Sequence, residues 1–168
     1  MKVINLFGGP GTGKSTVAAD LFAKMKWMNK NVELIGEYAK DATWEKRHQL
    51  FDDQLYILAK QNRKLERLKN QVEYVITDSP LLLNIAYIDP NYFPLTYPKF
   101  VRNLYDSYNN LNIFLLREKP YHAIGRRQTE EEARAIDARV IDLLHDSNQE
   151  WYTIKADEKA RDEILKLL

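Results

Sequence analysis

Cysteine is absent from all 168 residues of the chain. Its absence excludes disulfide scaffolds, zinc sites built on thiolates and thiol nucleophiles. Long apolar runs are absent as well, since none approaches the roughly 20 residues that a membrane span needs. The apolar stretch near the N-terminus, KVINLF, is too short for a signal peptide. We therefore expect a protein of the cytoplasm that makes no membrane contact.

An excess of charge of either sign is missing too. Lys and Arg number 25 against 24 Asp and Glu, which leaves a formal net charge of +1. Proteins that hold duplex DNA by neutralising its phosphates are usually strongly basic, so the balanced charge disfavours that class. A local basic groove is still compatible with a balanced total charge. Repeats, low-complexity tracts and Gly/Ser- or Pro-rich linkers are also lacking. A single domain over residues 1–168 is the expected organisation.

Short apolar runs alternate along the chain with longer helical patterns. Strands are predicted at 2–7, 32–36, 74–77, 112–116 and 151–155, and helices at 13–28, 47–70, 98–110, 129–146 and from 157 to the C-terminus. The fourth helix opens with the capping box Thr129-x-x-Glu132, and Asp157 is expected to cap the last one.

Three helices have apolar stripes that predict their buried faces. The first should bury Val17, Leu21 and Met25. The long second helix should turn toward the core with Phe51, Leu55, Leu58, Leu65 and Leu68. The third should use Phe100, Leu104 and Tyr108.

Strands that alternate with helices of ten or more residues indicate βαβ units, and hence a parallel sheet covered by helices on both faces. Ligands of such folds bind beyond the carboxyl ends of the strands. Gly8, Glu37, Asp78 and Arg117 each follow a predicted strand, so all four should lie at that edge.

A phosphate-binding motif fills the first of these positions. Residues 8–15, GGPGTGKS, match G-x-x-x-x-G-K-[ST] and stand between a strand and a helix, which is the context that the motif requires. Glycines let backbone N–H groups turn around phosphate oxygens, and the helix N-terminus adds unpaired N–H groups. The predicted nucleotide-binding residues are Gly8, Gly9, Pro10, Gly11, Thr12, Gly13, Lys14, Ser15 and Thr16. Lys14 would reach the β- and γ-phosphates, and the Ser15 hydroxyl would ligate Mg²⁺.

Asp78 ends the third strand and is followed by Ser79-Pro80. A carboxylate at this position can hold Mg²⁺ opposite Ser15. The alternative is a turn cap, because Asp-Ser-Pro is common in turns. A P-loop requires a metal partner, which favours the metal interpretation.

The segment after the fourth strand is rich in arginine. Arg117 is followed by the pair Arg126-Arg127 and by Arg134, in a stretch that contains a glycine. Arginines on a closing flap stabilise the charge on a transferring phosphoryl group. Glutamates at 130–132 offer the alternative of a solvated charged helix. The sequence contains no Asn-Lys-x-Asp guanine reader and has no room for the helical subdomain of ring-forming ATPases.

These motifs together resemble the small P-loop kinases of nucleosides and nucleotides. The resemblance rests on the P-loop, Glu37-Tyr38-Ala39, Asp78-Ser79-Pro80 and the arginine flap. It is greatest to the AAA-type domain shared by the nicotinamide riboside kinase module of NadR and many phage-encoded proteins. It implies a three-layer α/β/α sandwich with a five-stranded parallel sheet in the order 2-3-1-4-5, ATP with Mg²⁺, and a lid at about 118–132. A phage-encoded protein would act in the host cytoplasm.

The acceptor is expected near the second strand and the long helix. Glu37 would take a proton from an acceptor hydroxyl, or it is a surface glutamate that starts a loop. The other predicted acceptor-binding residues are Tyr38, Trp44, Arg47, Asp53, Gln54 and Gln61. Aromatic and cationic groups can stack on a base and amides can pair with its edge, but core packing or a solvated polar stripe explains them equally well.

The sequence thus predicts an ATP- and Mg²⁺-dependent kinase for a nucleoside, a nucleotide or a related building block. Its catalytic residues would be Lys14, Glu37, Arg126 and Arg127, its metal ligands Ser15 and Asp78, and Arg117 would contact the nucleotide. One alternative acceptor is a hydroxymethyl-pyrimidine or a 5′-end within nucleic acid. Another alternative is an ATP-binding switch without turnover. The expected partners are the small-molecule acceptor and, in a homodimer, a second copy of the chain.

Overall fold

The computed structural model describes residues 1–38, 53–122 and 128–168. Five strands form one sheet in the order β2-β3-β1-β4-β5, and every neighbouring pair is parallel. The strands are β1 (Lys2–Phe7), β2 (Val32–Ile35), β3 (Tyr74–Thr77), β4 (Asn109–Leu116) and β5 (Trp151–Lys155). Both the parallel sheet and its predicted order are confirmed.

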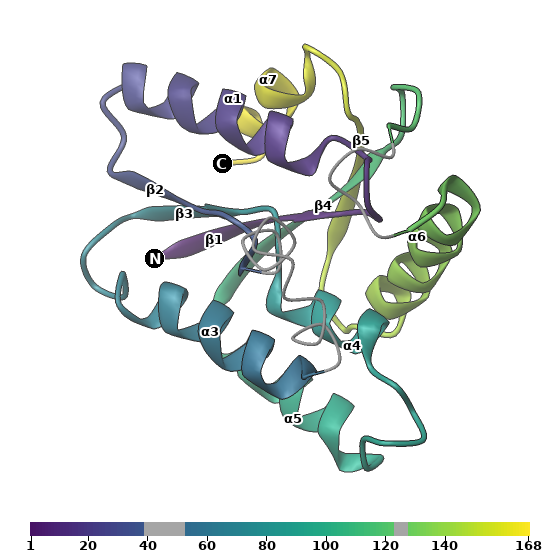
Figure 1. The fold of residues 1–168 in the computed structure, drawn as a ribbon. Coiled ribbons are helices and arrows are strands. Elements are labelled where there is room, and N and C mark those ends of the chain that lie inside the picture. The colour runs from purple at the N-terminus through teal and green to yellow at the C-terminus, as the bar shows by residue number, and fades with distance from the viewer. Residues whose placement is uncertain (39–52, 123–127) are drawn as a thin grey trace.

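Helices cover both faces of this sheet (Figure 1). One layer contains α1 (Lys14–Trp27) and α7 (Ala160–Leu165). The other contains α3 (Gln54–Glu66), the 3₁₀ turn η2 (Leu81–Leu83), α4 (Asn84–Tyr87), α5 (Thr96–Asp106) and α6 (Glu130–His145). The three-layer α/β/α arrangement is therefore the one expected. Within the described ranges, no helix combines the length and apolar character that crossing a bilayer requires.

The core has two halves, one on each side of the sheet. Val3 and Phe7 of β1 pack with α3, α5 and α6, whereas Ile4 and Leu6 pack with α1 and α7. This division follows from the pleat of a strand, because successive side chains point to opposite faces. On α1, the predicted stripe of Val17, Leu21 and Met25 is buried.

Two helices differ from the sequence prediction in the face that they bury. On α3, Leu58 and Leu65 are buried as predicted, but Leu55 is 53% exposed, and the other buried members of the stripe are Gln54 and Gln61. The predicted Phe51 lies outside the described residues. On α5, Phe100 is 54% exposed, and the core face consists of Tyr97, Val101 and Tyr105. The prediction favoured the more apolar residues, but tyrosines with hydrogen-bond partners and glutamines can be buried as well.

Several element boundaries also differ. β4 begins at Asn109 rather than 112, α5 begins at Thr96, and η2 and α4 were not predicted. Asp157 accepts from the Lys159 N–H at 2.8 Å, while the N-cap of α7 is Lys159, so Asp157 does not cap that helix. The capping box of α6 is confirmed, with Thr129 and Glu132 bonded reciprocally.

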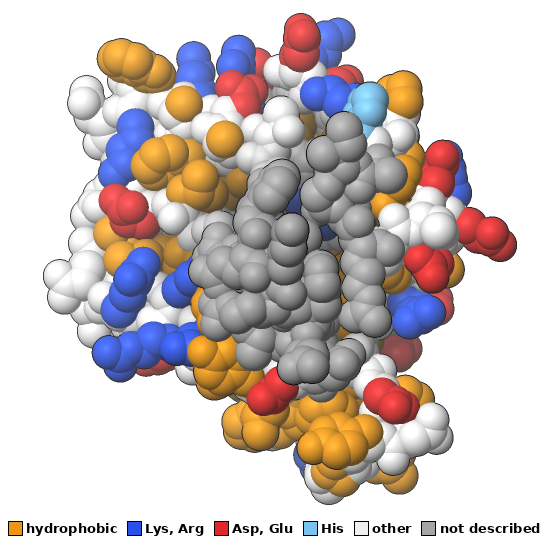
Figure 2. All heavy atoms as spheres, in the orientation of Figure 1, with side chains coloured by type: hydrophobic (Ala, Val, Ile, Leu, Met, Phe, Trp, Pro, Cys, Tyr) orange, Lys and Arg blue, Asp and Glu red, His pale blue; other side chains and the backbone are white. Residues whose placement is uncertain are grey.

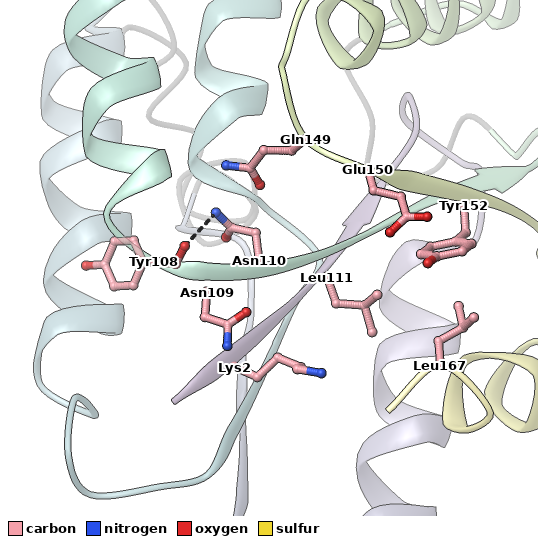
Figure 3. A pocket seen from close by; sticks show the side chains of 9 residues that line it. All are labelled: Lys2, Tyr108, Asn109, Asn110, Leu111, Gln149, Glu150, Tyr152 and Leu167. Atoms are coloured by element: carbon pink, nitrogen blue, oxygen red, sulfur yellow. Dashed lines mark hydrogen bonds between the residues drawn. The ribbon is translucent and has the colours of Figure 1, made fainter.

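A polar pocket lies at the end of the sheet where the strands begin. It has a volume of about 470 Å³ and is lined by Lys2, Asn109 and Asn110, with Gln149, Glu150 and Tyr152 among the other lining residues (Figure 3). Lys2 and Asn109 are register partners at the starts of β1 and β4. This pocket is therefore at the edge opposite to the one where the P-loop follows β1.

Candidate active site

The P-loop connects β1 to α1 and turns through left-handed backbone conformations. Gly8, Gly11 and Gly13 have φ values of 137°, 77° and 106°, which side-chain-bearing residues rarely adopt. Gly13 is the N-cap of α1, and no side chain caps this helix within the described residues. The first N–H groups of α1 are thus left for an anion, as phosphate binding requires.

Lys14 folds back over the loop. Its Nζ atom donates to the Gly8 carbonyl at 2.7 Å and to the Gly9 carbonyl at 2.9 Å. Burial lowers the pKa of the Lys14 amine. Three carboxylates oppose that shift, in decreasing order Glu37, Asp78 and Asp137. These carboxylates come from three different elements, so the tertiary structure gathers them around the lysine.

Asp78 and Ser15 are the two residues predicted to hold a metal ion. Asp78 directly follows β3 and is buried, and Ser15 is exposed in the first turn of α1. The Ser79 N–H donates to the Thr77 hydroxyl at 3.1 Å, so this turn N–H is held by Thr77. No cluster of three or more potential metal ligands exists among residues 1–38, 53–122 and 128–168. This donor set suits Mg²⁺, which is usually held by one or two protein groups together with substrate phosphates.

Arg117 lies across the mouth of the P-loop. Its Nη1 atom donates to the Pro10 carbonyl at 2.9 Å, and its Nη2 atom pairs with the Asp137 carboxylate at 2.9 Å. The guanidinium carbon also lies 6.0 Å from the centre of the Tyr121 ring. The structure thus brings Arg117 to the P-loop, at the sheet edge where the sequence predicted a residue after the fourth strand.

The predicted acceptor side is formed by the end of β2 and by α3. Gln61 is 3% exposed, and its amide nitrogen donates to the Thr77 hydroxyl at 3.2 Å. Its amide oxygen has no hydrogen-bond partner among the described residues. Gln54 is also buried, but its side-chain oxygen accepts from Asn84 at 2.9 Å. Asp53 is exposed and caps α3 by accepting from the Tyr56 N–H at 3.0 Å.

Tyr38 follows Glu37 and packs against α3. Its ring lies 5.8 Å from the Tyr56 ring, and the two hydroxyl oxygens are 3.2 Å apart. Lys64 Nζ lies 5.7 Å from the centre of the Tyr38 ring, and Lys60 Nζ lies 5.1 Å from that of Tyr56. Of the predicted aromatic and cationic groups, the described residues contain only Tyr38, which directly follows the half-buried Glu37; its partners Tyr56 and Lys64 were not predicted.

Four of the predicted site residues lie outside the described residues: Trp44, Arg47, Arg126 and Arg127. Arg134, the remaining flap arginine, pairs with Glu130 at 2.8 Å on the surface of α6, with 63% of its side chain exposed. For Arg134, the contact that the structure shows is the i,i+4 ion pair of a solvated helix.

Sequence reasoning missed two residues at this site. Asp137 on α6 contacts the loop, but in the sequence it is one of many charges on a polar helix. Burial raises the pKa of Tyr87, and the charges of Glu37 and Asp137 raise it further, so this phenol lies within electrostatic reach of both carboxylates. The position of Tyr87 in a stretch rich in aromatics and prolines was the only available signal, and it did not distinguish a pocket wall from a surface connection.

Comparison with solved structures agrees with this architecture. A deoxyadenosine kinase from M. mycoides with bound dATP superposes with a TM-score of 0.59 at 20% identity, over 99% of this chain and 98% of that chain. Shikimate kinase from Aquifex aeolicus superposes with a TM-score of 0.54 at 16% identity, over 99% of this chain and 95% of that chain. The chain has no significant match among curated protein sequences.

The fold and the loop geometry define the class: this is a P-loop protein with the three-layer architecture of small kinases. Within that class, the AAA domain family matches residues 3–161, which is nearly the whole chain. The chain belongs to that family.

Proposed function

We propose that this chain is an ATP- and Mg²⁺-dependent kinase that phosphorylates a nucleoside, a nucleotide or a related building block. The observation that carries the proposal is that the sheet order β2-β3-β1 brings Glu37, Asp78 and Lys14 to one edge of the sheet, where the charges of both carboxylates act on the pKa of Lys14. These carboxylates follow β2 and β3, whereas Lys14 follows β1. A metal-binding carboxylate and a second acidic group beside the phosphate-binding lysine are what phosphoryl transfer requires.

The donor half of the site would hold the nucleotide phosphates through the backbone of residues 8–16. Lys14 would stabilise the charge on the β- and γ-phosphates, together with Arg126 and Arg127. Ser15 and Asp78 would hold Mg²⁺, which supplies positive charge to the phosphate oxygens when bound. The left-handed glycines and the uncapped start of α1 fit such an anion.

The acceptor half would present a hydroxyl group to Glu37. The carboxylate would accept the hydroxyl proton while oxygen attacks the γ-phosphorus, and the bond from that phosphorus to the bridging oxygen would break to leave ADP. The Gln61 amide oxygen, buried without a hydrogen-bond partner among the described residues, suits a donor on the acceptor. The two solved structures compared above are kinases by name, which supports a phosphotransferase.

A product screen tests this function. Purified protein would be incubated with Mg²⁺ and γ-labelled ATP against nucleosides, nucleoside monophosphates and single-stranded DNA. We expect label in one acceptor class, and none when Lys14→Ala replaces the wild type, because the cation at the β/γ-phosphates is then lost. Transfer at the wild-type rate by Lys14→Ala would contradict the assignment, and ATP binding without transfer to any acceptor would favour the switch.

A second candidate acceptor is a nucleic acid strand, and the surface of α3 favours it. Lys60, Arg63 and Arg67 are exposed on this helix, at positions that place them along one side of it. Lys and Arg side chains gather over α3 in the space-filling view (Figure 2). This local group is compatible with a chain whose net charge is only +1, and the exposed Glu66 on the same helix offsets part of its positive charge.

The tyrosines beside this basic surface strengthen the second candidate. Tyr38, the residue after Glu37, and Tyr56 each have a lysine amine over the ring. Cations that neutralise phosphates and aromatic rings that stack on bases are the usual elements of a single-strand site. Binding of an oligonucleotide should then weaken steeply with salt, and it should weaken in Arg63→Gln. Phosphorylation of a nucleoside but not of the oligonucleotide would exclude this candidate.

A further inference from the structure

One peptide group of the P-loop is held from both of its ends. The Gly8 carbonyl accepts from Lys14 Nζ at 2.7 Å, and the Gly9 N–H donates to Asp137 Oδ1 at 2.5 Å. These two groups belong to the same peptide unit, and the described residues contain no cis peptide bond. In a trans peptide the C=O and N–H point in opposite directions. Asp137 therefore lies on the side of this peptide opposite to Lys14.

The other oxygen of the carboxylate holds Arg117. Asp137 Oδ2 accepts from Arg117 Nη2 at 2.9 Å, and Arg117 Nη1 donates in turn to the Pro10 carbonyl. The side chains are only 7% and 19% exposed for Arg117 and Asp137. A charge with so little access to water needs a hydrogen-bonded partner, so each of these groups depends on the other.

The fit between α6 and the loop leaves no room for a side chain at Gly9. A Cβ atom on Gly9 would lie 2.4 Å from the Ala133 carbonyl oxygen and 2.7 Å from Asp137 Oδ1. α6 is itself fixed in the core by Ile136, Val140 and Leu144, which are buried. Asp137 is thus presented to the loop from a firmly packed helix rather than from a mobile segment.

We propose that Asp137 is a positioning residue for the nucleotide site. Its carboxylate fixes the Gly8–Gly9 peptide in the orientation that gives Lys14 its carbonyl partner, and it holds Arg117 across the mouth of the loop. The inference rests on the proposed ATP site and extends it to a residue that does not touch the phosphates. Asp137 contacts the loop on the side opposite to Lys14, so its carboxylate does not compete with the phosphates for the loop. Its loss should therefore lower the affinity for the nucleotide.

The direct test is the affinity for a non-hydrolysable ATP analogue with Mg²⁺, measured by calorimetry. We expect the dissociation constant of Asp137→Ala to rise roughly 10- to 100-fold, the usual range for losing a hydrogen bond to a charged group. Asp137→Asn should show a smaller rise, because its amide oxygen can still accept from Gly9 but no longer carries the charge that pairs with Arg117. Asp142→Ala, an exposed aspartate on the same helix, is the matched control and should bind like the wild type.

Kinetics separate positioning from a general loss of structure. Once bound, the phosphates hold Lys14 and the loop in place, so KM for ATP should rise while kcat at saturating ATP changes less than about threefold. In an Arg117→Gln background the further effect of Asp137→Asn should nearly vanish, because the two side chains act as a pair.

Unchanged affinity in both Asp137 variants, tighter binding, or additive effects with Arg117→Gln would each overturn the inference. The inference would also be overturned if kcat and 1/KM fell equally and Tm were lower in both variants, because that pattern indicates a purely structural role. If the wild type itself did not bind the analogue, the proposed ATP site would be wrong instead.

Discussion

At the scale of single residues, the proposed chemistry depends on carboxylates whose roles differ by position. Asp78 follows β3, the strand next to β1, whereas Glu37 follows β2 at the edge of the sheet. β3 therefore separates Glu37 from the P-loop strand. This sheet order is the basis for proposing that Asp78 serves the phosphates and Glu37 the acceptor, although Glu37 is also the carboxylate with the largest effect on the pKa of Lys14.

Replacing Glu37 by Gln keeps the shape of the side chain but removes its charge. If Glu37 accepts the proton of a hydroxyl, transfer should fall by roughly 10²- to 10⁴-fold, the usual contribution of a positioned acid or base. Affinity for ATP, measured by calorimetry, should stay almost unchanged. A much smaller loss is expected for a monophosphate acceptor, whose oxygen needs little deprotonation near neutral pH. A variant that fails to bind ATP would place Glu37 in the donor half and refute this role.

Replacing Asp78 by Asn tests the metal-binding role. Mg²⁺ prefers charged oxygen ligands, so the variant should need more Mg²⁺ for half-maximal rate and should turn over more slowly at saturation. Its Tm should match that of the wild type, since the Ser79 N–H is bonded to Thr77. The measurement is a Mg²⁺ titration of activity. An unchanged titration curve would reduce Asp78 to a residue of the turn.

At the scale of elements, local signals predicted some boundaries well. β1, β3 and β5 begin and end where the apolar runs do, and α6 begins at its capping box. The faces of α3 and α5 were predicted less well. On these helices the buried tyrosines and glutamines form hydrogen bonds with partners from other elements, such as Asn84 for Tyr97 and Thr77 for the amide nitrogen of Gln61. The spacing of apolar residues along one helix cannot reveal partners that come from other elements.

The capping box gives a prediction for α6, the helix that carries Asp137. Thr129→Ala removes the hydroxyl that accepts from the Glu132 N–H, which should cost about 1 kcal/mol of stability. For a chain of this size, Tm should fall by roughly 2–4 °C in a calorimetric scan. Thr129→Ser keeps the hydroxyl and serves as the control. A Tm equal to that of the wild type in the alanine variant would show that the box does not limit the stability of α6.

At the scale of the whole molecule, a buried polar network joins β1 to β4. Asn5 Nδ2 donates to Asn110 at 2.9 Å and to Asn112 at 3.1 Å, and the Tyr105 hydroxyl of α5 donates to Asn112. Asn5 and Asn112 are almost completely buried. Desolvated amides are costly unless paired, so this network fixes which strand lies beside β1 and in which register.

Asn5→Leu should therefore destabilise the entire domain. It leaves the side-chain oxygen of Asn110 without this donor, at a cost of about 1–3 kcal/mol. Urea unfolding is the measurement, and the midpoint should fall with an unchanged slope. Asn103→Leu, the same change at an exposed position of α5, is the control. If Asn5→Leu were as stable as the wild type, the network would have no net role in holding the sheet together.

The sequence by itself determined the features whose causes are local. Glycine spacing, the lysine and serine that follow, and the apolar run before them define a P-loop without further context. Alternating strand and helix periods define a parallel α/β fold. Each of these properties is set by neighbours within a few turns of chain, and so it can be read from one stretch of residues.

Only the tertiary structure decided which distant groups meet. The pairing of Asp137 with Gly9 and Arg117, and the pairing of Gln61 with Thr77, each join elements far apart in the chain. In sequence Asp137 is one carboxylate among 24 acidic residues, and nothing local distinguishes it from its neighbours on α6. Its role arises because the sheet order places β4 beside β1, which brings the segment after β4 and the helix α6 against the P-loop. Contacts of this kind depend on the packing of whole elements rather than on the pattern of any one of them.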